Sequence, residues 1–424
     1  MTGRTTESDA EPEDPDGASA KASGAAKPTE PTGPLSGVRV LDVSSVIMGP
    51  YATQLLGDMG ADVIAVESAA GDTNRSMGAG PHRQLSGTSL NLLRNKRNVS
   101  INFKHPDGRR ALLDIAATCD VFVTNLRPGP LTRAGLAYAD VAAVCPDIVY
   151  CQAQGYPSGE SRQDEPAYDD VIQAESGVAD AATRAIGQPA LAATLLADKV
   201  CGLTIVYSVA AALYRRAQTG EGEHIEIPMR DTVEAFLLVE HGSAAVPRPP
   251  LGPAGYPRIL SPHRRAWPTR DGWMVVMPYS KDHFDHVFAA GGRDDLIGDE
   301  RYATGRQRIA NAGFLYGEVG RMLAGRTTAE WLTLFRRDDV PAGEVATLDQ
   351  LVDDLPEADH PHVGTYKLIP PSVRFARAPQ SVRRPAPLIG EHTDEVLGEV
   401  GYGQEELAAL RASGAVGQVA AELA

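Results

Sequence analysis

Residues 35–68, LSGVRVLDVSSVIMGPYATQLLGDMGADVIAVES, decide the fold class of this chain. The apolar run at 38–43 predicts a strand, PYATQLLGDMG (50–60) predicts a helix that ends at Gly60, and ADVIAVES (61–68) predicts a second strand. A strand, a helix and a strand in this order form a βαβ unit, which favours a parallel sheet covered by helices.

The same alternation continues as far as residue 229. Further strands are predicted at KRNVSINF (96–103), DVFVTNL (120–126), PDIVYCQAQGY (146–156) and GEHIEIPM (222–229), with helices at PDGRRALLDIAATC (106–119) and 199–217. We therefore expect an α/β protein with a Rossmann-like parallel sheet. The first turn, SSVIMGPY (44–51), has a single glycine, and the chain contains neither a GxGxxG motif nor a Walker P-loop, so these motifs give no support for nucleotide binding.

Two stretches rich in Pro and Gly, 242–262 and 360–390, interrupt this pattern. The segment between them predicts a hairpin around Asp271 and Gly272, followed by amphipathic helices at 308–326 and 328–338. We interpret it as a smaller α+β domain inserted into the larger one. The predicted boundaries are 1–33 for a disordered tail, 34–229 and 388–424 for the two parts of the large domain, 230–261 and 346–387 for linkers, and 262–345 for the small domain.

Composition excludes several classes of function. The formal net charge of -15 leaves no basic stripe for a nucleic acid. The four cysteines lack CxxC spacing, so neither a metal site nor a disulfide framework is predicted. No apolar run behind a basic start and no apolar stretch of about 18 residues suggests export or a membrane span. We expect a cytoplasmic protein with no nucleic-acid or membrane partner and no metal.

One carboxylate stands out. In LLADKVCG (195–202), Asp198 lies between two apolar runs, where an unpaired buried charge costs several kcal/mol. The simpler explanation is helix capping, because Asp is a favoured N-cap for the helix predicted at 199–217. The alternative is that a ligand approaches the ionised Asp198, which then acts as a nucleophile.

A second acidic group and several cations accompany Asp198. In PAYDD (166–170), Asp169 or Asp170 either caps the next helix or lies beside Asp198. Cations gather at loops and strand ends of the parallel-sheet half, at 94–97, Lys104, Arg127 and Arg133. They are either solvated surface charges or the binding site of a phosphate-bearing ligand.

Taken together, these segments resemble the family III CoA-transferases (CaiB/BaiF family), which include formyl-CoA and carnitine CoA-transferases and the α-methylacyl-CoA racemases. The order and spacing of the segments carry the resemblance: 35–68, NKRNVSINFKHPDGRRALL (95–113), CDVFVTNLRPGPLTRAGL (119–136), CPDIVYCQAQGY (145–156), PAYDDVIQAESG (166–177), 196–229, VPAGEV (340–345) and PLIGEHTDEVLGEVGY (387–402).

The resemblance implies a large Rossmann-like domain built from both chain ends, an inserted small domain, and an interlocked homodimer. It also implies a CoA-transferase of EC 2.8.3 type, whose partners are an acyl-CoA and a free carboxylic acid and which needs no cofactor. Asp198 falls where the family keeps its nucleophile, which forms aspartyl anhydride and aspartyl-CoA thioester intermediates, and Asp169 matches an acid beside it.

The CoA-binding residues that the resemblance implies are Ile47, Met48, Arg97, Ile101, Lys104, Asn125, Leu126, Arg127, Arg133 and Tyr168. Two departures matter. Ala65 and Ser68 stand where other members have basic residues, so Arg75 or Arg97 is expected to supply phosphate contacts. Tyr168 replaces the histidine of the racemases, which disfavours racemisation. An acyl-CoA racemase or isomerase and a non-catalytic CoA-binding protein remain the alternatives. Arg264 or Arg265 is a candidate partner for the second carboxylate of a dicarboxylic substrate.

Overall fold

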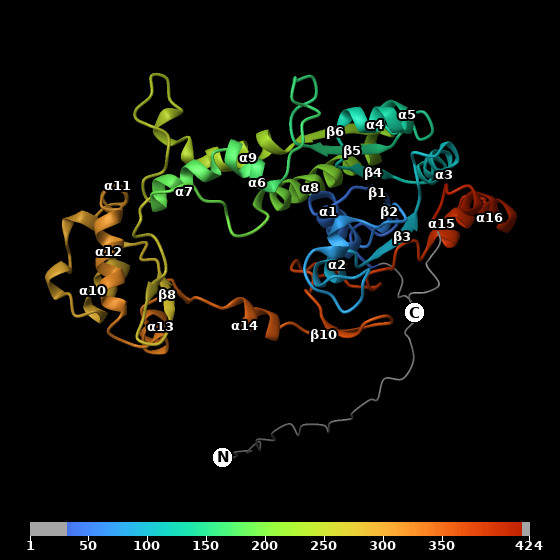
Figure 1. Cartoon of the computed structure of the whole chain (residues 1–424). Helices are drawn as coiled ribbons and strands as arrows, with labels where there is room; N and C mark the ends of the chain where they lie inside the picture. The colour runs from blue at the N-terminus through green and yellow to red at the C-terminus, as the bar shows by residue number, and fades with distance from the viewer. Residues whose placement is uncertain (1–31, 418–424) are drawn as a thin grey trace, which may run out of the picture. The chain divides into compact units, whose positions relative to one another are not determined.

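A six-stranded parallel sheet forms the centre of the α/β part of the computed structural model, which describes residues 32–417 (Figure 1). Its strands are β1 (Arg39–Val43), β2 (Asp62–Glu67), β3 (Lys96–Ser100), β4 (Val121–Thr124), β5 (Val149–Gln154) and β6 (Glu223–Pro228). Their order is β3-β2-β1-β4-β5-β6, and every neighbouring pair is parallel. The α/β prediction is confirmed, and the order is that of a doubly wound sheet.

Helices cover both faces of this sheet because residues of one strand alternate between the faces. On β1, Leu41 and Val43 belong to one hydrophobic core and Val40 belongs to the other. The first core is completed by α3 (Pro106–Ala116), α4 (Pro128–Ala134), α5 (Tyr138–Ala142), α15 (Thr393–Glu399) and α16 (Gln404–Ala412). The second is completed by α1 (Met48–Asp58), α6 (Asp169–Glu175), α8 (Leu196–Thr219) and α9 (Met229–His241).

Both ends of the described chain build the same core. Val396 and Leu397 of α15 and Leu407 of α16 are buried with Leu41 of β1. Figure 1 shows α15 and α16, in red, beside α3. The C-terminal segment therefore completes the sheet that the N-terminal segment begins.

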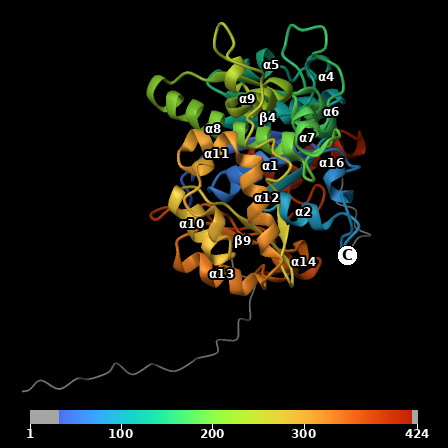
Figure 2. The ribbon, with the colours of Figure 1, turned by 90° about the vertical axis from the view of Figure 1, so that its left-hand side faces the viewer.

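The segment from 267 to 344 has a hydrophobic core of its own. It contains the antiparallel strands β7 (Trp267–Pro268), β8 (Trp273–Val276) and β9 (Ala342–Glu344), and the helices α10 (Lys281–Ala290), α11 (Gly305–Ala310), α12 (Ala312–Leu323) and α13 (Thr328–Arg337). Figure 2 shows these helices, in orange, gathered around β9. The predicted hairpin is present, since the Thr269 N–H donates to the Gly272 carbonyl at 2.9 Å.

Both predicted linkers contain regular structure. Helix α9 lies at the start of the stretch 230–261, where Val233 is buried in the sheet core. The stretch 346–387 contains α14 (Leu348–Asp353) and the hairpin of β10 (Glu357–His360) and β11 (Gly364–Lys367). Pro and Gly content indicates a change of pattern at these stretches, but it does not predict the short elements within them. The remaining helices, α2 (Gly87–Leu92) and α7 (Val178–Ile186), also belong to connections. The tail predicted at 1–33 lies outside the described residues, except for 32–33.

Helix α8 qualifies the expectation about membranes. By length and apolar composition it could cross a bilayer, and it is the one such helix among residues 32–417. Its residues Ala197, Cys201, Ile205 and Val209 are buried against the sheet. One face of α8 is thus a core face of the α/β fold.

Candidate active site

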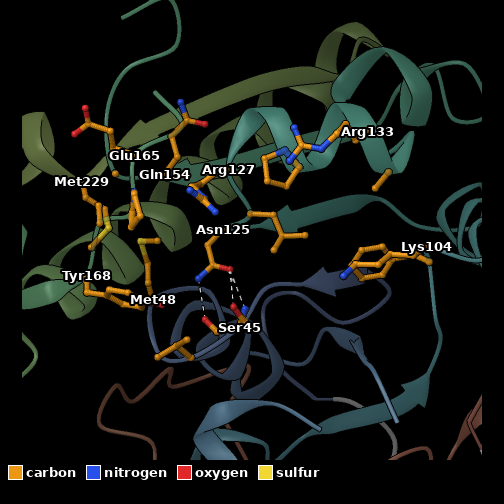
Figure 3. Close-up of a pocket in the computed structure, with 18 of the residues that line it drawn as sticks. Ser45, Met48, Lys104, Asn125, Arg127, Arg133, Gln154, Glu165, Tyr168 and Met229 are labelled. Carbon is orange, nitrogen blue, oxygen red and sulfur yellow. Dashed lines mark hydrogen bonds between the residues drawn. The ribbon is translucent and has the colours of Figure 1, made fainter. Parts of the chain in front are cut away.

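The site lies where the strand order of the sheet reverses, between β1 and β4. In such folds the loops after the two diverging strands leave a crevice at the carboxyl edge. Here two hydrogen bonds join the loops. The Ser45 N–H donates to the Asn125 side-chain oxygen at 2.9 Å, and the Asn125 amide donates to the Ser45 carbonyl at 2.8 Å (Figure 3). A cavity of about 880 Å³ opens at this point.

A buried polar cluster holds the loop after β1. The Asp42 carboxylate accepts hydrogen bonds from Ser44, from Thr53 and from the Lys96 ammonium, whose Nζ lies 3.1 Å from Oδ2. Lys96 also donates to the Pro50 carbonyl at 2.9 Å, although burial lowers its pKa. This cluster ties the first turn of α1 to the sheet.

The same loop contains a strained residue. Val46 has φ +68°, a left-handed conformation that a β-branched side chain rarely adopts. Its N–H donates to Asp72 at 3.1 Å, and its carbonyl accepts from Asn74 at 3.3 Å. Val46 lines the cavity, so these contacts keep a costly backbone conformation at the cavity wall.

Helix α8 brings Asp198 to the cavity, but not as the predicted N-cap. The helix begins at Leu196, and Asp198 is the third residue of its first turn. The cap comes from α6, where Oδ1 of Asp169 accepts the Asp198 N–H at 3.0 Å. The helix predicted at 199–217 is present within α8, but the capping explanation for Asp198 is wrong, because a residue 29 positions earlier supplies the acceptor.

Close packing places Asp198 near the loop after β1. A Cβ atom on Gly202, one turn along α8, would lie 3.0 Å from the Met48 carbonyl and 2.9 Å from the Tyr51 ring. Glycine at this position lets α8 approach α1. The Asp198 carboxylate consequently shares a cavity with Met48.

Asp198 is a half-buried carboxylate without a protein partner. Among residues 32–417, no hydrogen bond or ion pair to its side-chain oxygens is present. Burial, and secondarily the negative charge of Asp169, raise its pKa to about 6. The Asp198 carboxylate does not cap the helix, and no cation among residues 32–417 neutralises it. It is therefore available to a ligand.

The opposite part of the cavity is cationic. Lys104, Arg109 and Arg133 line it, and none of them has a carboxylate partner within the described part of the chain. Arg127 is held by the Asp164 carbonyl at 2.6 Å. Figure 3 shows Lys104 and Arg133 at the right of the cavity, with Tyr168 and Met48 at the left.

Most of the predicted site residues line this cavity. They are Ile47, Met48, Lys104, Asn125, Leu126, Arg127, Arg133, Tyr168 and Asp198. Asp169 is buried directly behind Asp198, where Gln173 also donates to it. Arg97 and Ile101 do not line the cavity. Ile101 is buried against the sheet and pairs with Val416.

Arg75 and Arg97 are committed to the fold instead. Arg75 forms a two-bond ion pair with Glu67 at 2.7 Å, and Arg97 contacts Asp62 and Glu399 at 2.6 Å each. The expectation that one of them replaces the missing family cations is therefore not supported by their positions. Arg109, which the sequence analysis did not single out, lies at the cavity instead. Its place three residues after Pro106, in the first turn of a helix that follows a parallel strand, was the available signal.

Comparison with known proteins agrees with this geometry. The sequence profile of CoA-transferase family III matches residues 35–393. The chain belongs to this family. It is 32% identical to succinyl-CoA:glutarate CoA-transferase of Mus musculus, with 91% of each chain covered. It is 30% identical to succinate–glutarate CoA-transferase of Agrobacterium fabrum, over 87% of this chain and 96% of that one.

A solved structure, a CaiB/BaiF family protein from Brucella suis, resembles it with a TM-score of 0.73 at 25% identity, over 87% of this chain and 100% of the other. Membership of family III makes the chain an enzyme of the CoA-transferase class, EC 2.8.3 type. The cavity at the β1/β4 switch point is then the candidate site for an acyl-CoA.

Proposed function

We propose that the enzyme moves CoA from an acyl-CoA thioester to a free carboxylic acid, with Asp198 as the nucleophile. The observation that carries the proposal is the partnerless Asp198 carboxylate in the wall of a cavity whose other end is cationic. With a pKa of about 6, roughly nine in ten Asp198 side chains are ionised at pH 7. A carboxylate of this kind can attack a thioester.

The proposed reaction exchanges activated acyl bonds. A carboxylate oxygen of Asp198 attacks the thioester carbonyl, the C–S bond breaks, and a mixed anhydride and CoA thiolate result. The thiolate attacks the aspartyl carbonyl, giving aspartyl-CoA thioester and releasing the donor acid. The acceptor carboxylate attacks this thioester, forming a second anhydride and thiolate. The thiolate then attacks the acceptor acyl carbonyl, which releases the new acyl-CoA and restores Asp198.

The orientation of CoA follows from charge. Lys104, Arg109 and Arg133 are positioned to contact its phosphates, and the pantetheine arm would run along Leu126 and Met48 towards Asp198. The N–H of Met48, the first residue of α1, has no acceptor within the helix, and Met48 lines the same cavity, so this group is a candidate to stabilise the oxyanions.

Dicarboxylic acids are the substrates we propose, because the curated relatives in mouse and Agrobacterium are named for succinyl or succinate and glutarate. Racemisation remains the disfavoured alternative. Tyr168 lines the cavity with two thirds of its surface exposed, and a phenol is a far weaker base than histidine near neutral pH.

We also propose the interlocked homodimer with an inserted small domain. Support comes from the exposed apolar side chains of α8 and α9, Leu203, Tyr207, Tyr214, Phe236 and Val239, which present more apolar surface than scattered single residues would. A second copy of the chain is the proposed cover. A cytoplasmic location and the absence of a metal or redox cofactor remain predictions from the sequence.

The decisive experiment mixes the enzyme with succinyl-CoA and glutarate, follows glutaryl-CoA by mass spectrometry, and traps the acyl-enzyme with hydroxylamine. We expect transfer and an adduct on Asp198. Asp198→Asn should lower kcat by at least about a thousand-fold, whereas Asp170→Asn, a change at an exposed acid of the same region, should leave it near wild type. Transfer that survives in folded Asp198→Asn would overturn the proposal. Exchange of the α-proton without transfer would favour a racemase, and CoA binding without turnover a binding protein.

A further inference from the structure

A second cavity, of about 160 Å³, lies in the segment with the separate hydrophobic core. We propose that it binds a short aliphatic dicarboxylate. Its walls come from residues 256–258, the start of α10, and the helices α11 and α12. None of its lining residues lines the cavity at Asp198. The proposal rests on the proposed function in one respect, since it gives the same class of acid a second site, apart from the cavity in which the acid reacts at Asp198.

Arg258 is the centre of this cavity. Its Nε donates to the Tyr316 hydroxyl at 2.7 Å, and its guanidinium lies 4.8 Å from the Tyr279 ring centroid. Its Nη2 lies 3.1 Å from the Met277 sulfur, and its side chain also hydrogen-bonds to Tyr279 and Tyr256. No carboxylate pairs with this guanidinium among residues 32–417. The tyrosines orient the cation without neutralising it.

A second arginine contributes to the same wall. Arg308 of α11 donates through Nη1 to the Tyr302 carbonyl at 2.9 Å, which fixes its direction and leaves Nη2 without a partner among the described residues. In the part of the chain that the structure describes, no Asp or Glu lines the cavity. Two half-buried cations that have no carboxylate partner among residues 32–417, one of them with an unbonded Nη2, favour a ligand with two anionic groups.

The remainder of the wall and the volume narrow the ligand class. Phe284, Ile309, Ala312 and Leu315 give the cavity an apolar side, which suits methylene groups. A volume of 160 Å³ excludes CoA itself. Planar carboxylates match guanidinium groups in pairs of hydrogen bonds. A short chain of methylene groups between two carboxylates fits the apolar wall, the small volume and the two guanidinium groups.

Neighbouring cations do not serve this cavity. Arg264 and Arg265, which the sequence suggested for a second carboxylate, line a separate hollow of about 200 Å³, where the Arg265 guanidinium stacks 4.1 Å from the Trp267 ring. Tyr316 lies between the two hollows and lines both.

The test is glutarate binding to the CoA-free enzyme, measured by isothermal titration calorimetry without turnover. We expect saturable binding of glutarate and weaker binding of butyrate, which has the same kind of chain but one carboxylate. Arg258→Gln and Arg308→Gln should each weaken glutarate binding by about 10- to 100-fold. Arg306→Gln is the matched control, because Arg306 lies on the same helix as Arg308 and is exposed away from the cavity.

Asp198→Asn separates this proposal from the proposed function. The variant should bind glutarate like wild type even though transfer is lost. Should Arg258→Gln fail to fold, through loss of its bond to Tyr316, Arg308→Gln decides the question alone. No heat of binding with glutarate, equal affinity for butyrate, or wild-type affinity in folded Arg308→Gln would each overturn the second site.

Discussion

The main-chain N–H of Asp198 donates to the Asp169 side chain at 3.0 Å, so the acid that raises the pKa of Asp198 also holds it in place. Asp169 supplies the acceptor that the first turn of α8 needs, and its charge disfavours ionisation of its neighbour. The two neighbouring carboxylates therefore have different roles. The Asp169 carboxylate caps the helix, and the Asp198 carboxylate is the reactive group.

The charge of Asp169 can be tested apart from its hydrogen bond. Asp169→Asn keeps a side-chain oxygen for the Asp198 N–H but removes the charge that helps to raise the pKa of Asp198. The acidic limb of the kcat/KM profile for acyl-CoA, expected near pH 6 in wild type, should therefore shift to lower pH. Asp170→Asn should not move it. An unchanged limb in Asp169→Asn would mean that another group controls it.

A nucleophile with a raised pKa should weaken the fold at neutral pH. Asp198 binds a proton more tightly in the folded chain, at about 6, than at its ordinary value of 3.8. Its contribution to stability is therefore full below about pH 4 and is lost as pH rises through about 6. Asn is neutral throughout, so Asp198→Asn should raise the free energy of unfolding at pH 7.5 by about 1–3 kcal/mol and by less at pH 4.5. Urea denaturation at both pH values measures this, and a larger gain at pH 4.5 would contradict it.

Arg109 should matter for CoA affinity. Arg109→Gln removes a cavity cation that has no carboxylate partner among residues 32–417, so KM for acyl-CoA should rise about 10-fold or more with little change in kcat. The neighbouring Arg110, which pairs with Asp107 at 3.2 Å, provides the control through Arg110→Gln. The penalty should shrink with a dephosphorylated CoA thioester if Arg109 contacts the 3′-phosphate. Equal KM values for the two variants would remove Arg109 from the site.

Arg97, unlike Arg109, should matter for stability and not for CoA affinity. Its guanidinium is buried, its pKa is raised by hydrogen bonds to Glu399 and Asp62 against the effect of burial, and it does not reach the cavity. Arg97→Gln should lower the free energy of unfolding by about 1–3 kcal/mol, less than for a fully buried pair because its partners are part-exposed. Measured KM for acyl-CoA should stay near wild type. A raised KM without loss of stability would return Arg97 to the CoA site.

The sequence was informative where the signal was local. Alternating strands and helices between 38 and 229 predicted the parallel sheet, since each element carries its own periodicity. Cations were harder to assign, because Arg97 is neutralised by Glu395 and Glu399, about 300 positions away along the chain. No local pattern distinguishes such an arginine from Arg109, whose guanidinium remains free for a ligand.

The start of helix α8 was also hard to predict, because its cap comes from a distant part of the sequence. Asp198 looked like a cap because Asp is a favoured N-cap residue, whereas the acceptor on Asp169 comes from a different element. Helix α9 lies mostly in the stretch assigned to a linker, and its exposed Phe236 and Val239 obscure an amphipathic pattern. In both cases the partner surface lies elsewhere in the molecule or, for α9, in the proposed second copy.

The shared core of the two chain segments also constrains how this enzyme is made. Leu41 emerges from the ribosome more than 350 residues before Val396, Leu397 and Leu407, which bury it. Until these late residues are translated, one face of the nascent sheet has no complete cover. Synthesis must therefore finish before the crevice between β1 and β4 is stable, and chaperones that shield apolar strands during translation would have their greatest effect on this face.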